Sequence, residues 1–310
     1  MAVIEVHDLR KAYGELHAVD GISWSASEQE VVAILGPNGA GKTTTVEIVE
    51  GYRRRDSGQV SVLGFDPATG GRSFRERIGI VLQEAGFEEQ FTVRELVRLQ
   101  AGFYPHPRAA DEVIEMVDLA EKADERVKTL SGGQRRRLDL ALGIVGDPEV
   151  LFLDEPTTGF DPSARRRAWV LVDRLRDLGA TILLTTHYMD EAESLADRVI
   201  VMNRGVIVAE GTPDQLAADA GVETIVSFRM PEGVEGIELP RMGDGIRIDG
   251  SAVEIRSQQP TADIHGLAGW ALDHDVELAD LRLTRPSLED IYLGLTDTAA
   301  DVGHEASVEQ

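Results

Sequence analysis

The sequence predicts an α/β protein in which helices cover a parallel sheet, followed by a small α+β domain. Over the first 220 residues, short aliphatic runs alternate with helical patterns, which is typical of a parallel sheet. After Pro213 the pattern changes to short alternating strands with glycine turns. The hydrophobic fraction of 42% and the charged fraction of 28% are those of a globular protein. We therefore expect one domain at residues 1–218 and a second at residues 219–296.

Four buried strands are the clearest elements of the first domain. Each is almost entirely apolar, as expected for strands covered on both faces. They are residues 31–35, 78–82, 150–153 and 181–185. Residues 92–146 interrupt the alternation with one helical pattern after another, beginning with a capping box formed by Thr92 and Glu95. We therefore expect a helical insertion at about residues 87–146.

The second domain is predicted from short strand and helix patterns. Strands are expected at residues 223–228, 253–256 and about 276–284, and helices at about 261–274 and 287–295. The residues expected in its core are Trp270, Leu272 and Leu278. An apolar stripe on the last helix consists of Leu288, Ile291, Tyr292 and Leu295, and it either closes this core or packs against a second copy of the protein. The small, polar residues 297–310 are expected to be a disordered tail.

Composition excludes several classes of protein. No apolar stretch reaches the roughly 18 residues that suggest a membrane span. The chain has no cysteine, so disulfides and thiolate metal sites are excluded and a cytoplasmic location is expected. The net charge of −24 argues against a basic surface that binds nucleic acid or anionic lipid. We therefore expect no direct binding of nucleic acid.

The segment after the strand at residues 31–35 fits the pattern of a phosphate-binding loop. It consists of Gly36, Pro37, Asn38, Gly39, Ala40, Gly41, Lys42 and Thr43, and it opens a helix that begins near Thr44. Its glycines allow backbone N–H groups to turn toward phosphate oxygens, and the helix N-terminus adds partial positive charge. Lys42 is suited to the β and γ phosphates and Thr43 to Mg²⁺.

A second signal is the carboxylate pair at the end of the strand at residues 150–153. Asp154 leaves the strand where it can hold Mg²⁺ through water, as the second acidic element of phosphate-loop ATPases does. Glu155 alternates to the other side, where it can polarise an attacking water. The pair is expected to act together with the phosphate-binding loop.

A third segment reads Leu130-Ser131-Gly132-Gly133-Gln134 and lies 23 residues before Asp154. By itself it predicts a loop that opens a helix, with Ser131 as the N-cap. Together with the loop before it and the carboxylates after it, it makes the chain resemble the ATP-binding cassette family, whose signature has this sequence. The resemblance covers residues 1 to about 215, and the motifs occur in the family's order.

The resemblance implies roles for further residues. Gln83 corresponds to the Q-loop glutamine, Asp161 to the D-loop, His187 to the switch histidine, and Tyr13 to the aromatic residue that stacks on adenine. His187 follows the strand at residues 181–185, so it leaves the sheet at the same edge as the carboxylate pair. Phe160 departs from the usual D-loop leucine.

The implied fold is an ABC-type nucleotide-binding domain, and the implied ligands are ATP and Mg²⁺. The expected catalytic residues are Glu155, His187 and Lys42. The expected Mg²⁺ ligands are Thr43, Gln83 and Asp154. The expected nucleotide-binding residues are Tyr13, Gly36, Pro37, Asn38, Gly39, Ala40, Gly41, Lys42, Thr43, Thr44, Gln83, Ser131, Gly132, Gly133, Gln134 and Asp161. In the family, two copies pack head to tail, so that each ATP lies between the phosphate loop of one and the signature of the other.

Two groups of residues leave alternatives open. Phe87, Phe91, Phe103 and Tyr104 either form the core of the helical insertion or line a groove for a cytoplasmic helix of a permease, as this region does in the family. The basic runs at residues 53–55 and 135–137 either bind nucleic acid or form solvated, ion-paired helix faces, and we expect the second.

The function implied is that of the ATPase subunit of a prokaryotic efflux transporter. The segments 186–193 and 285–293 resemble the multidrug and antibiotic export branch of the family. The implied partners are separately encoded membrane permease subunits and a second copy of the ATPase, at the cytoplasmic face of the membrane. Two alternatives are an exporter of polysaccharide or lipid and a soluble ATPase that acts on a ribosome or DNA complex.

Overall fold

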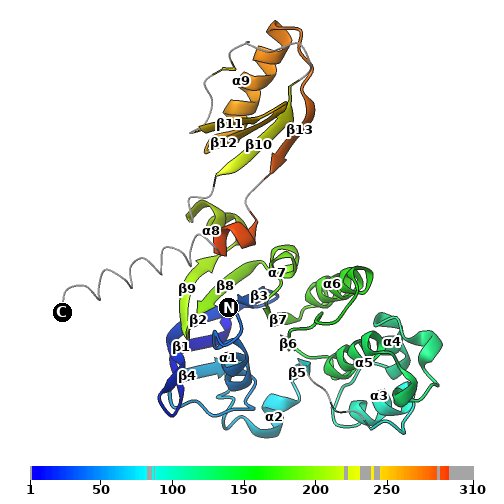
Figure 1. Ribbon diagram of the computed structural model, residues 1–310. Helices are drawn as coiled ribbons and strands as arrows, with labels where there is room; N and C mark the ends of the chain where they lie inside the picture. Colours follow the sequence, from blue (N-terminus) through cyan, green and yellow to red (C-terminus); the bar gives the residue numbers. More distant parts are fainter. Residues whose placement is uncertain are drawn as a thin grey trace, which may run out of the picture. The chain divides into compact units, whose positions relative to one another are not determined.

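The computed structural model describes residues 2–81, 86, 88–219, 223–230, 239–240, 245–284 and 287–292 (Figure 1). The chain forms two compact units, Met1–Pro213 and Asp214–Gln310, and each is described by itself. Four expectations from the sequence lie outside the described residues, namely those for Gln83, Phe87, Leu295 and the tail at residues 297–310.

A six-stranded sheet in the order β5-β6-β7-β3-β8-β9 forms the centre of the first unit. Its strands are β3 (Val31–Leu35), β5 (Ile78–Val81), β6 (Val150–Asp154), β7 (Thr181–Thr186), β8 (Arg198–Asn203) and β9 (Val206–Gly211). All neighbours pair in parallel except β8 and β9. Strands β3, β6 and β7 are buried along their whole length, which confirms the prediction of a parallel sheet covered on both faces.

A second, three-stranded antiparallel sheet packs beside the first and was not predicted. It consists of β1 (Ala2–Tyr13), β2 (Leu16–Ser27) and β4 (Ser57–Val62), in the order β2-β1-β4. Helix α1 (Lys42–Val49) contacts strands of both sheets, and one apolar cluster joins them through residues such as Ile4, Val46 and Phe152. The start of α1 is thereby fixed against the end of β3.

The helical insertion is present as predicted. It contains α3 (Val93–Ala101), α4 (Ala110–Met116), η1 (Ala120–Lys122), η2 (Val127–Thr129) and α5 (Gly132–Ile144). The capping box of Thr92 and Glu95 is confirmed at the start of α3. Helix α5 contacts β5, so the insertion is attached directly to the edge of the central sheet (Figure 1). The remaining helices of this unit are α2 (Gly71–Arg75), α6 (Pro162–Asp177) and α7 (Met189–Leu195).

The second unit is an antiparallel sheet in the order β11-β12-β10-β13 with one helix packed on it. Its elements are α8 (Pro213–Asp219, whose first residue belongs to the first unit), β10 (Thr224–Arg229), β11 (Gly245–Asp249), β12 (Ala252–Ser257), α9 (Pro260–Asp273) and β13 (Ala279–Thr284). These bounds confirm the predicted α+β class.

The predicted core of the second unit is partly wrong. Trp270 is buried and Leu278 packs against the same cluster, but Leu272 is 83% exposed. Two residues along a helix turn the side chain by about 200°, so Leu272 points away when Trp270 faces the sheet. Leu288 and Ile291 are buried, yet neither belongs to the cluster around α9.

Candidate functional site

The candidate residues converge because the carboxyl ends of neighbouring parallel strands lie at one edge of the sheet. Strand β7 pairs with β3 on one side and with β6 on the other, with Leu35 opposite Thr186 and Asp154 opposite Thr185. The phosphate-binding loop follows β3, Asp154 ends β6, and His187 follows β7. Ligands of open α/β sheets bind at such an edge.

The loop between β3 and α1 requires glycine at two positions. A Cβ on Gly36 would lie 2.3 Å from the carbonyl oxygen of Met202, and one on Gly41 would lie 2.2 Å from that of Ala18. Gly41 also has a φ of +100° and Gly39 a φ of +82°, both in the left-handed region that side chains disfavour. The backbone is thus held in a tight turn that ends at the N-terminus of α1, the arrangement that phosphate groups favour.

Lys42 lies beneath this loop as a buried cation. Its Nζ donates to the carbonyl oxygens of Gly36 (2.8 Å) and Pro37 (3.1 Å). Burial lowers the pKa of the Lys42 ammonium, while the charges of Glu155 and Asp154 raise it. An anionic ligand in the loop would favour the charged form of this desolvated ammonium.

Asp154 is buried at the end of β6 and is held by β7. The hydroxyl of Thr185 donates to Asp154 Oδ1. Burial raises the pKa of the Asp154 carboxyl, the bond from Thr185 lowers it, and the charge of Glu155 raises it. A carboxylate that is desolvated and beside a second carboxylate is a suitable ligand for a divalent cation.

Glu155 has an unusual backbone and two side-chain partners. Its φ is +48°, a left-handed conformation that costs a residue other than glycine about 1–3 kcal/mol and that is concentrated at functional sites. Its N–H donates to Thr185, its Oε2 accepts from the hydroxyl of Thr158 (3.2 Å), and its Oε1 lies 3.3 Å from Nδ1 of His187. The ring of Tyr188 lies 4.1 Å from that of His187, centroid to centroid. The structure thus brings two of the three expected catalytic side chains, Glu155 and His187, into direct contact.

The signature segment begins helix α5. Ser131 is the N-cap, and its side chain accepts from the backbone N–H of Gln134 while the Gln134 side chain accepts from the N–H of Ser131. A Cβ on Gly132 or Gly133 would meet no atom within 4 Å. The packing of the described residues therefore does not demand glycine there and leaves room for a ligand over the helix N-terminus.

The structure also describes four other expected site residues, which are Tyr13, Thr43, Thr44 and Asp161. Tyr13 ends β1 and is 41% exposed, with Lys11 Nζ 5.5 Å and the Arg53 guanidinium carbon 5.3 Å from its ring centroid. Asp161 is the N-cap of α6 and accepts from two backbone N–H groups. Thr43 is exposed and Thr44 is half-buried on α1. Among the described contacts, none joins Ser131 to the loop that contains Lys42.

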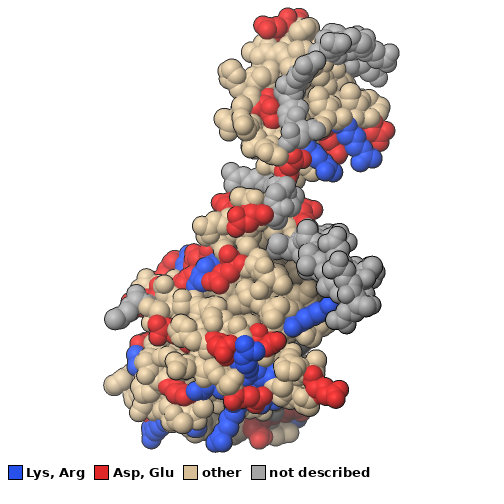
Figure 2. All heavy atoms as spheres, turned by 90° about the vertical axis from the view of Figure 1, so that its left-hand side faces the viewer, with Lys and Arg blue, Asp and Glu red and all other residues tan. Residues whose placement is uncertain are grey.

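The basic run at residues 135–137 is only partly a surface feature. Arg135 and Arg137 form ion pairs with Glu89 and Asp118, as expected for an ion-paired helix face. Arg136 corrects that interpretation, because its side chain is only 11% exposed and donates to the backbone carbonyl groups of Asp154 and Glu155. Figure 2 shows acidic and basic side chains interspersed over the face that it displays.

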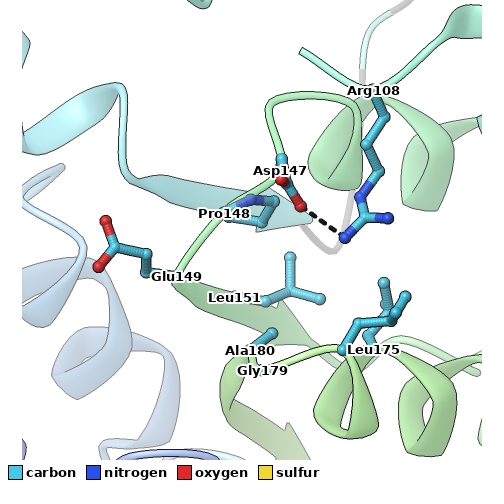
Figure 3. Close-up of a pocket in the computed structure, with 9 residues that line it drawn as sticks. Arg108, Asp147, Pro148, Glu149, Leu151, Leu175, Gly179 and Ala180 are labelled. Atoms are coloured by element: carbon cyan, nitrogen blue, oxygen red, sulfur yellow. Dashed lines mark ion pairs between the residues drawn. The ribbon is translucent and has the colours of Figure 1, made fainter. Parts of the chain in front are cut away.

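A small cavity of about 150 Å³ lies at the opposite edge of the sheet, near the start of β6 and the end of α6 (Figure 3). It is lined by Leu151 and Leu175 and closed by an ion pair between Arg108 and Asp147 at 2.5 Å. This cavity lies away from the edge at which Lys42 and Glu155 converge.

Sequence comparison identifies two family models. Residues 19–158 match the model described as ABC transporter. Residues 224–287 match a model described as ABC transporter domain-containing protein-like, C-terminal domain. The two matches fall in the two compact units.

Curated relatives match nearly the whole chain. The daunorubicin/doxorubicin resistance ATP-binding protein DrrA of Streptomyces peucetius is 38% identical over 96% of this chain and 93% of its own length. The Nod factor export ATP-binding protein I of Paraburkholderia xenovorans is 39% identical over 95% of this chain and 97% of its own length.

Solved structures match the first unit. An ATP-binding subunit of an ABC transporter superimposes with a TM-score of 0.65 at 26% identity, and it covers 71% of this chain and 93% of that one. A bacterial ABC transporter cassette described as dimeric superimposes with a TM-score of 0.61 at 25% identity, and it covers 67% of this chain and 98% of that one.

Proposed function

The chain belongs to the ABC transporter family, and we propose that its converging residues form the nucleotide site of an ATPase subunit that powers efflux of drugs or other small amphipathic compounds. The family and the resistance proteins related to it make the chain an ATP hydrolase coupled to transport. The observation that carries the site assignment is the convergence of Lys42, Asp154 and the Glu155–His187 pair at one sheet edge.

Each of these residues has its own role in the proposed chemistry. Lys42 and the backbone N–H groups of the loop hold the β and γ phosphates of ATP. Glu155 orients the attacking water and accepts its proton, and His187 holds the γ phosphate against Glu155. The distance of 3.3 Å between Glu155 Oε1 and His187 Nδ1 supports these two roles.

The residues present also fit a magnesium ion. Asp154, with its oxygen held by Thr185, and the exposed hydroxyl of Thr43 supply hard oxygen ligands at the same edge. Gln83, the third expected ligand, lies outside the described residues. When bound, Mg²⁺ neutralises charge on the phosphates.

The signature segment is proposed to act on the ATP of a second copy. The open N-terminus of α5, with two glycines that no packing requires, offers backbone N–H groups to a phosphate from outside the chain. A structural relative described as dimeric supports a dimer. The head-to-tail arrangement is the one that the resemblance to the family implies. Each ATP would then lie between the Lys42 loop of one subunit and Ser131 of the other.

The permease is proposed to be a separate membrane protein that holds this subunit at the cytoplasmic face of the membrane. Within the described residues, no helix is long and apolar enough to cross a bilayer. Phe91 and Phe103 of the helical insertion are exposed, which favours the permease groove over the core for these two residues, whereas Tyr104 is half-buried. The net charge of −24 is the ground for expecting that nucleic acid is not a ligand.

The test of this function is the Glu155→Gln variant. The amide keeps the shape of the side chain and removes the carboxylate, so ATP binding should persist while turnover falls by about 100-fold or more. ATP-bound dimers should accumulate, as measured by light scattering. Lys42→Ala should instead weaken ATP binding in calorimetry. Hydrolysis by Glu155→Gln near the wild-type rate would refute the role of Glu155.

A cargo assay separates export of drugs from the alternatives. The subunit, reconstituted with its permease in vesicles, should hydrolyse ATP faster when an amphipathic drug is added. The relative named for Nod factor export is matched with similar identity, so stimulation by a glycolipid in place of a drug would favour the polysaccharide or lipid alternative. Stimulation by ribosomes or DNA without a permease would favour a soluble ATPase.

A further inference from the structure

Arg136 lies at a junction that the proposed function does not use. It belongs to α5, the helix that begins at Ser131, and its side chain is 11% exposed. The guanidinium reaches the segment where β6 ends, and there it meets the backbone on both sides of Glu155. A residue of the signature helix thus contacts the backbone of the proposed catalytic carboxylate.

The guanidinium binds three successive carbonyl groups. Nη2 donates to the oxygens of Asp154 (2.7 Å) and Glu155 (2.9 Å), and Nε donates to that of Pro156 (3.1 Å). The sheet ladder ends at this point, and a buried carbonyl group that leaves a ladder needs a partner from elsewhere. The oxygen of Glu155 also accepts from the N–H of Thr158 at 3.2 Å. Only the rigid, forked guanidinium can satisfy several acceptors in fixed directions, whereas a lysine ammonium is a flexible point charge.

Asp139 holds the guanidinium in place. Its Oδ2 accepts from Arg136 Nη1 at 2.9 Å, and its side chain is 9% exposed. The two residues are three apart on α5, so they share one face of the helix. Burial raises the pKa of the Asp139 carboxyl to about 6, and the charge of Arg136 opposes this. The pair is therefore a rigid unit of α5 and moves with that helix.

The backbone that this unit holds is strained. Glu155 has a φ of +48°, and a conformation of this kind persists only when surrounding contacts fix it. On the other side, the Glu155 N–H is held by Thr185 of β7. The position of the carboxylate relative to its own nucleotide thus depends on contacts from two elements, of which one is the signature helix.

We propose that Arg136 is a positioning residue that couples the two nucleotide sites of the dimer. The inference rests on the head-to-tail dimer proposed above. In that dimer, the N-terminus of α5 touches the ATP of the partner, while Glu155 acts on the ATP of its own subunit. A shift of α5 on contact with the partner's ATP is passed through Arg136 to the backbone of Glu155. Occupancy of one site therefore sets the rate of hydrolysis in the other.

The test uses mixed dimers in which only one subunit hydrolyses ATP. The partner subunit always carries Glu155→Gln, so that it binds ATP without hydrolysing it. In half of the samples the partner also carries Lys42→Ala, so that its site stays empty. Single-turnover hydrolysis by the other subunit is compared between the two partners. With Arg136 present, the filled partner should accelerate hydrolysis at least about fivefold.

The variant Arg136→Lys keeps the positive charge beside Asp139 but removes the forked guanidinium, which donates in several fixed directions. The rate ratio between filled and empty partners should fall to within about twofold of one, while ATP affinity of the isolated subunit stays within about twofold of wild type. The matched control is Arg137→Gln, which removes a cation from the next position and should keep the wild-type ratio. Arg136→Gln provides a second variant if the lysine variant does not fold.

Two outcomes would overturn the inference, and they are distinguishable. An unchanged ratio in Arg136→Lys, with both rates lowered in parallel, would mean that Arg136 only stabilises the fold. If Glu155→Gln forms no ATP-bound dimer in light scattering, the head-to-tail model fails and this inference fails with it.

Discussion

Replacing Glu50 by glutamine should remove a pH dependence from the stability of the first unit. Glu50 ends helix α1 and is 5% exposed. Burial, together with the charges of Asp154 and Glu47, raises the pKa of the Glu50 carboxyl from an ordinary 4.5 to about 8. The folded protein therefore keeps this proton at pH values where the unfolded chain has lost it.

The sign and size of the effect follow from this difference. Because the pKa is raised on folding, the contribution of Glu50 to stability is fully present below about pH 4.5 and is lost as the pH rises through about 8. At about 1.4 kcal/mol per pKa unit, the whole loss is about 5 kcal/mol. Between pH 6 and pH 9 the wild type should lose about 3 kcal/mol through this group.

The assay is urea unfolding at pH 6, 7.5 and 9, followed by tryptophan fluorescence. The chain has three tryptophans, so a Trp270→Phe background leaves reporters only in the first unit. Glu50→Gln should flatten the curve of unfolding free energy against pH. Glu28→Gln, at an exposed glutamate of the same unit, is the matched control and should keep the wild-type slope. Parallel curves for Glu50→Gln and wild type would refute a buried, protonated Glu50.

Substitutions at three further positions test other contacts of the first unit. Gly41→Ala should destabilise the first unit by about 1–3 kcal/mol in urea unfolding, because of the clash with the carbonyl of Ala18 and the positive φ; a wild-type midpoint would contradict this. Thr185→Val should lower kcat about tenfold, because it removes the hydroxyl that donates to Asp154, whereas Thr185→Ser should retain activity. An equal loss of kcat in both variants would refute the role of this hydrogen bond. Buried Glu191 accepts from the hydroxyl of Thr157 and the indole N–H of Trp169. Glu191→Leu should therefore lower the free energy of unfolding by about 1–3 kcal/mol and Glu191→Gln by less. Equal stability of the leucine variant and wild type would refute a stabilising role for these bonds.

The central sheet was predictable because parallel strands covered on both faces must be apolar throughout. Strands β3, β6 and β7 were found within a residue of their observed ends for that reason. The polar residues that follow such strands necessarily share an edge, so the meeting of Lys42, Asp154 and His187 also followed from sequence.

The antiparallel sheet was not predicted because its signal is irregular. Strands β1 and β2 run for 12 residues each, but their pairing shifts register at four points, so the alternation of buried and exposed residues is broken. A reading that depends on strict alternation cannot recognise such strands. The bulges decide which residues of β1 are buried, and these bulges depend on the partner strand.

The contact between Arg136 and the backbone near Glu155 could not be predicted from the sequence for a different reason. A basic run is ordinarily read as surface because arginine is seldom buried unless paired. Consecutive residues on a helix differ by about 100° in direction, so a helix that packs on one side must turn at least one of three neighbours inward. One residue of the sequence indicates which of the three arginines points inward. Asp139 lies three positions after Arg136 and is one of the buried residues of α5. This spacing indicates a buried ion pair, but the carbonyl groups it serves lie about 20 residues away, and only the packing of α5 against the end of β6 brings them within reach.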